Sequence, residues 1–106
     1  MIIKTGNPFS MLVIMRDSET REAIEITSDM EISSTIVNSS RQVIAQCEVA
    51  VCDQSTIKGG FILGVNQEIT ADWKVGVAKG DIRVKIGDVD KNSVNYSFLI
   101  EESITR

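Results

Sequence analysis

The sequence contains no histidine. This absence excludes the Ser-His-Asp and Cys-His arrangements that activate many enzyme nucleophiles, and it removes a usual ligand of protein zinc sites. The two cysteines cannot fill a four-coordinate zinc site on their own, and the commonest general base is missing as well. We therefore expect a protein that is not an enzyme and that uses no metal or other cofactor.

Long apolar runs and blocks of basic residues are also lacking. No segment approaches the ~18 apolar residues of a membrane-spanning helix, and the opening MIIKTGNPF has no apolar core of a signal peptide. The formal net charge is −4, and an acidic chain without clustered lysine and arginine is poorly suited to a phosphate backbone. We expect a protein made in a cytoplasm that binds neither a membrane nor nucleic acid.

What remains is the composition of a small globular domain. Hydrophobic residues make up 42% and charged residues 25% of the 106 residues, which is an ordinary balance for a folded protein. The length corresponds to about one domain, and no boundary divides residues 1–106. The apolar residues are mainly isoleucine and valine, a β-branched enrichment that favours strands.

Short segments of alternating apolar residues recur along the chain, and turn residues separate them. We expect strands over residues 9–15, 22–26, 31–37, 42–53, 60–65, 81–86 and 93–100. A spacing of roughly 8–12 residues without a convincing amphipathic helix is typical of an antiparallel β-sandwich or small barrel. The segment 9–15 is apolar on both faces and should be covered on both sides.

The longest expected strand, residues 42–53, contains both cysteines. Its alternation predicts that Val43, Ala45, Cys47, Val49 and Val51 share one face. Cys47 and Cys52 would then lie roughly 16 Å apart, far beyond the ~7 Å between α-carbons that a disulfide permits. We expect buried, reduced thiols.

Residues Asp88 to Asn92 imitate the start of a calcium-binding loop, D-x-D-x-N. The match then fails, because the sixth position is Ser93 where the motif has glycine and the twelfth is Leu99 where it has glutamate. A hairpin turn over residues 87–92 is the better interpretation.

The single tryptophan, Trp73, stands between two expected strands. It could plug the core with its indole N–H bonded to a carbonyl, or it could anchor a partner as an interface hot spot. We favour the core plug, with Ile69 and Trp73 facing inward and Gly76 turning the backbone before the strand that starts at Asp81. Trp73 should then be less than half exposed and should close one end of the sandwich.

One ordered set of residues spans the second half of the chain. It comprises Gly60, Phe61 and Leu63, then Thr70, then Trp73, Gly76 and Asp81, and it closes on Ile104, Thr105 and Arg106. This set resembles the immunoglobulin-like β-sandwich domains of tailed bacteriophage and prophage structural proteins, such as the N-terminal domains of baseplate upper proteins. The segment GNPFSMLVIM is similar to the opening strand of the same family.

The resemblance implies an antiparallel immunoglobulin-like β-sandwich of seven to eight short strands with a structural role in a virion, as a tail, baseplate, collar or decoration protein. Its partners would be other virion proteins, in multiple copies, contacted through sheet edges, loops and the N-terminal Met1, Ile2 and Ile3. The residues leave one alternative open, a free cytoplasmic β-sandwich binding module of the inhibitor or immunity type that recognises a basic partner.

Overall fold

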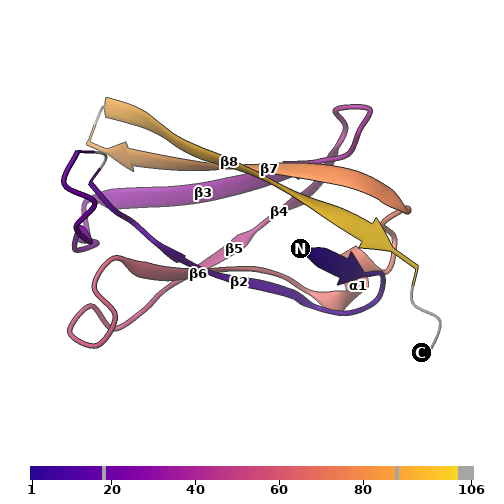
Figure 1. Ribbon diagram of the computed structural model, residues 1–106, viewed down its shortest axis with the longest axis horizontal. Helices are drawn as coiled ribbons and strands as arrows, with labels where there is room; N and C mark the ends of the chain where they lie inside the picture. The colour runs from indigo at the N-terminus through magenta and orange to yellow at the C-terminus, as the bar shows by residue number, and fades with distance from the viewer. Residues whose placement is uncertain (18, 88, 103–106) are drawn as a thin grey trace.

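Two β-sheets form the protein and appear as the upper and lower layers of Figure 1. The computed structural model describes residues 1–17, 19–87 and 89–102, and the side chains of all of these except 89–94. The strands are β1 (Ile2–Lys4), β2 (Phe9–Ile14), β3 (Met30–Val37), β4 (Val43–Gln46), β5 (Glu48–Val51), β6 (Gly60–Val65), β7 (Gly76–Ile86) and β8 (Val89–Glu101), and one short helix is α1 (Gln67–Thr70). The all-β class predicted from the sequence is confirmed.

The five-stranded sheet has the order β1-β8-β7-β3-β4, and the three-stranded sheet has the order β2-β6-β5. The pair β1–β8 is parallel, so the expectation of a purely antiparallel fold is wrong at this pair. The chain passes from β1 through the turn at residues 6–8 into β2 of the opposite sheet. Strand β1 therefore forms no antiparallel hairpin with the next strand and pairs with the distant last strand instead. The Lys4 ammonium binds the Glu101 carboxylate at 2.6 Å across this pair.

The core lies between the two sheets, where alternate side chains of facing strands meet. The largest fully buried side chains are Phe9, Ile36, Phe61, Leu63, Thr70 and Ile100. The ring of Phe98 lies 5.3 Å from that of Phe9 and 5.7 Å from that of Trp73, measured between ring centres. The strands expected at 31–37, 60–65 and 93–100 are confirmed. The apolar residues of the first two lie on the core side, as do Tyr96, Phe98 and Ile100 of the third.

The expected single strand over residues 42–53 is wrong. The chain crosses from the five-stranded to the three-stranded sheet at Cys47, which separates β4 from β5. The Cys47 N–H still donates to the Ser34 carbonyl at 2.9 Å. Because the chain changes sheets there, residues near both ends of the segment 42–53 lie away from the core. Val43 is 60% and Val51 is 52% exposed.

Two expectations for the N-terminal third also need correction. Strand β2 is not covered on both sides, since it packs inward through Phe9 and leaves Leu12 54% exposed on the outer face. Residues 22–26 form no strand but only an isolated bridge between Ala23 and Arg16. That segment lies over the end of β2 instead, where the Ile24 N–H donates to the Met15 carbonyl at 2.8 Å.

The connection between β6 and β7 contains a single helical turn that the sequence did not predict. Its cap is Asn66, whose side-chain oxygen accepts the N–H of Ile69 at 2.9 Å. The helical turn points Thr70 into the core and leaves Ile69 38% exposed, so the expectation of an inward-facing Ile69 is wrong. Strand β7 begins at Gly76, five positions before the expected start at Asp81.

The hairpin that joins β7 to β8 is shorter than expected, because Ile86 already pairs with Val89. The calcium-like residues 88–92 lie outside the residues whose side chains the structure describes.

Candidate functional site

Trp73 closes one end of the sandwich, as predicted. Its side chain is 6% exposed, and the indole N–H donates to the Ile44 carbonyl at 3.1 Å. The bond joins the loop after α1 to strand β4 and satisfies the polar atom of an otherwise apolar ring. Trp73 is therefore a core residue and not an exposed anchor for a partner.

Thr70 performs a second linking role that the sequence did not reveal. Its hydroxyl, fully buried, donates to the Asn7 carbonyl at 2.8 Å. This bond ties α1 to the turn between β1 and β2, more than sixty positions away in the sequence. The neighbouring loop reaches β7 through Gly76, whose φ of 149° is one that other residues rarely adopt.

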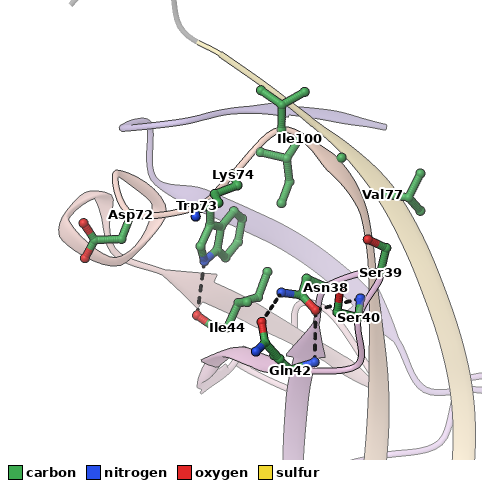
Figure 2. Close-up of a pocket in the computed structure, with 12 residues that line it drawn as sticks. Asn38, Ser39, Ser40, Gln42, Ile44, Asp72, Trp73, Lys74, Val77 and Ile100 are labelled. Carbon is green, nitrogen blue, oxygen red and sulfur yellow. Dashed lines mark hydrogen bonds between the residues drawn. The ribbon is translucent and has the colours of Figure 1, made fainter.

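A pocket of about 510 Å³ lies beside Trp73 (Figure 2). One wall is the β3–β4 turn, whose shape depends on Asn38. The side-chain oxygen of Asn38 accepts the N–H groups of Ser40 and Gln42 at 2.9 and 3.0 Å, and its amide nitrogen donates to the Gln42 side chain at 3.1 Å. These amides hold the turn, so the groups left to meet a ligand are the Ser39 and Ser40 hydroxyls, the Asp72 carboxylate and the Lys74 ammonium.

The lining residues offer hydrogen-bonding groups. Hydroxyl, amide, carboxylate and ammonium groups line the pocket, and none of its described residues forms a nucleophile–base pair of the kind that catalysis needs. Among residues 1–17, 19–87 and 89–102, no cluster of three or more histidine, cysteine, aspartate or glutamate residues could hold a metal ion. In the same part of the chain, no helix is long and apolar enough to cross a membrane.

Both cysteines are free, as expected, although they are half-buried and not fully buried. The Cys47 sulfur lies 3.7 Å from the Tyr96 hydroxyl, which is also hydrogen-bonded to the Ser34 hydroxyl at 2.8 Å. Burial is the main cause that raises the pKa of the Tyr96 phenol above its ordinary value. The phenol is therefore neutral and acts as a structural link between β8 and β3.

Exposed aliphatic side chains gather on the outer face of the five-stranded sheet. Ile2 and Val77 both lie directly opposite Leu99 in the register of β1, β8 and β7. Ile2 is 55% and Val77 50% exposed, and Met1 and Val75 beside them are also exposed. We call Met1, Ile2, Val75, Val77 and Leu99 the N-terminal apolar patch.

Only two of the three residues predicted as possible partner contacts belong to this patch. Met1 and Ile2 belong to it, whereas Ile3 points inward and packs against the core. Sequence reasoning missed Val77 and Leu99, because only the pairing of β1 and β7 on either side of β8 brings them next to Ile2.

The other predicted residues lie in different parts of the fold. Gly60, Phe61 and Leu63 belong to β6, where the two large side chains fill the core. The Asp81 carboxylate lies on the outer face of β7, where it accepts the Thr35 N–H at 3.2 Å. Residues 104–106 lie outside the described residues. The set therefore forms no single site, and its described members shape the fold.

The fold and the surface define an all-β protein with a pocket beside Trp73 and an exposed apolar patch that adjoins it through Val75 and Val77. No protein-family model and no curated protein matches this chain.

Proposed function

We propose that the chain is an immunoglobulin-like β-sandwich that serves as a structural component of a bacteriophage virion through protein–protein contacts. The residue pattern of the phage structural domains motivates the virion role. The strand order supports the immunoglobulin-like part of the proposal. Strands β2, β6 and β5 lie in the order of strands B, E and D of that fold, and β3, β7 and β8 lie in the order of C, F and G.

The observation that carries the protein–protein role is the N-terminal apolar patch. Ile2, Leu99 and Val77 form a row across three adjacent strands, and all three are substantially exposed. Contiguous exposed apolar side chains on a small protein mark an interaction surface more often than scattered ones do. The parallel pairing of β1 with β8 places Ile2 in this row, and the exposed ion pair between Lys4 and Glu101 lies two positions further along the same pair of strands.

The test is mass spectrometry of purified virions of the phage that encodes the chain. We expect the wild-type protein in multiple copies per particle. Val77→Lys should be depleted from particles, because it places a charge in the patch. Val43→Lys is the matched control, since Val43 is equally exposed but lies on the far edge strand β4.

Absence of the wild-type chain from purified particles would refute the virion role. Recovery of one basic host protein in stoichiometric amount, with no virion protein, would favour the free binding module instead. The net charge of −4 would suit such a partner.

A further inference from the structure

Strand β2 forms an open edge of the three-stranded sheet. It pairs with β6 through six consecutive positions without a bulge, and no strand in the described part of the chain pairs with its other side. The Met15 N–H donates to the Gly59 carbonyl at the end of this pairing. By the alternation of a strand, Phe9, Met11 and Val13 bond to β6, whereas Ser10, Leu12 and Ile14 direct their N–H and C=O groups to the open side.

Strand β2 lacks several features that usually prevent strand addition, although Pro8 comes directly before it. The segment FSMLVI contains no charge, and no proline interrupts it. The other sheet edges differ: β1 contains Lys4, β5 begins with Glu48, and β4 ends after four residues where the chain changes sheets. In an immunoglobulin-like sandwich strand A would cover this edge, but here β1 pairs with β8.

We infer that the open edge of β2 pairs in antiparallel fashion with the same edge of a second copy of this chain, with Leu12 opposite Leu12 across a twofold axis. The outward-facing groups of Ser10, Leu12 and Ile14 would then make roughly six main-chain hydrogen bonds with their counterparts. A closed twofold dimer needs such a self-complementary surface. The inference does not depend on a role in a virion.

The absence of like charges across the self-paired register is the observation that favours a second copy as the occupant. Two copies that each carry a net charge of −4 repel one another, so they can meet closely only where the surface is uncharged. In the register centred on Leu12, Ser10 faces Ile14 and Arg16 faces Pro8, so no like charges are brought together. The contact would also cover Leu12, which lies beside the partly exposed Ile62 of β6.

The space next to the edge fits the same register. A small cavity of about 100 Å³ lies between the sheets and is lined by Val13, Ile14, Met15, Arg16, Phe61, Ile82 and Val84. In the dimer, Met11 of the second copy lies opposite Val13 and points inward, toward this mainly apolar space. Methionine is unbranched and adapts well to an irregular gap.

The first experiment measures the mass of the protein by sedimentation equilibrium over a series of concentrations. We expect the wild type to be a dimer and Leu12→Lys to raise the dimer dissociation constant by about 100-fold, because two like charges meet at the axis. Val43→Lys is the matched control, since it charges a similarly exposed position on the other sheet, outside the N-terminal apolar patch, and should leave the dimer intact. Circular dichroism checks that each variant is folded.

The second experiment tests the register. An equimolar mixture of Leu12→Lys and Leu12→Glu should restore the dimer, since opposite charges then face each other. Hydrogen exchange should show the amides of Ser10, Leu12 and Ile14 protected in the wild type and unprotected in Leu12→Lys.

Three results would overturn the inference: a wild type that is monomeric at every concentration, a dimer that Leu12→Lys does not weaken, or β2 amides that become protected only when a different protein is added. Each of these results leaves the virion experiment unaffected, so the two proposals fail separately.

Discussion

Gln54 joins three segments of the chain through one side-chain amide. Its oxygen accepts the N–H groups of Ile26 and Gly59, both at 2.8 Å, and its nitrogen donates to the carbonyls of Cys52 and Gly60 at 2.9 and 3.1 Å. The side chain is half-buried, and it holds the loop before β6 against the segment 22–26. Replacing Gln54 should therefore loosen both segments together.

The expected cost follows from these four bonds. Each hydrogen bond contributes about 0.5–1.5 kcal/mol net, and a buried donor left without an acceptor costs more. We expect Gln54→Ala to lower the free energy of unfolding by about 3 kcal/mol. Urea denaturation followed by circular dichroism measures this change, and Gln46→Ala serves as the control because Gln46 is exposed on β4.

A second substitution tests the acceptor oxygen and the donor nitrogen of the Gln54 amide separately. Gln54→Glu keeps an acceptor for Ile26 and Gly59 but places a carboxylate against the carbonyls of Cys52 and Gly60. We expect a loss of stability at neutral pH that is partly recovered at low pH, where the protonated carboxyl can donate one bond. If Gln54→Ala were no more destabilising than Gln46→Ala, the four-bond explanation would be refuted.

The remaining predictions concern the core and its polar links. Trp73→Ala should lower the free energy of unfolding by about 3–5 kcal/mol, and Trp73→Phe should lower it less, although it leaves the Ile44 carbonyl without its donor; thermal unfolding measures both. Gly80→Ala should be strongly destabilising, because an added β-carbon would lie 2.1 Å from the Tyr96 ring, and the double variant with Tyr96→Leu should recover part of the loss. Because the pKa of Tyr96 is raised in the folded state, the unfolded chain loses this proton first, so stability should fall as the pH rises above about 10. Tyr96→Phe should flatten that decline in a pH series of urea titrations, and an unchanged slope would contradict the assignment.

The strands that could be predicted are those whose alternation matches their final burial. In β6, Phe61 and Leu63 alternate with a more exposed Ile62, so the period of two identified both the strand and its inner face. Trp73 was also predictable, since a large amphipathic ring next to a strand is most stable when buried with its N–H bonded.

The crossover at Cys47 could not be predicted in the same way. When a chain moves from one sheet to the other, apolar and polar residues keep alternating before and after the crossover. Residues 42–53 therefore look like one strand. The one-turn helix could not be predicted either, because it places Thr70 inward where we had expected Ile69 in a plain connection between strands. The apolar patch depends on pairing between distant strands, and local sequence carries no record of register between β1 and β8.

The parallel pair of β1 and β8 also orders events during folding. Lys4 and Glu101 are 97 positions apart, so β1 has no partner in its sheet until almost the whole described chain has been synthesised. Until then, Ile2 and Ile3 belong to a nascent segment whose apolar side chains are open to chaperones and to other chains. Contacts that close so long a loop form late and slow folding, and the edge at β1 should therefore be completed last.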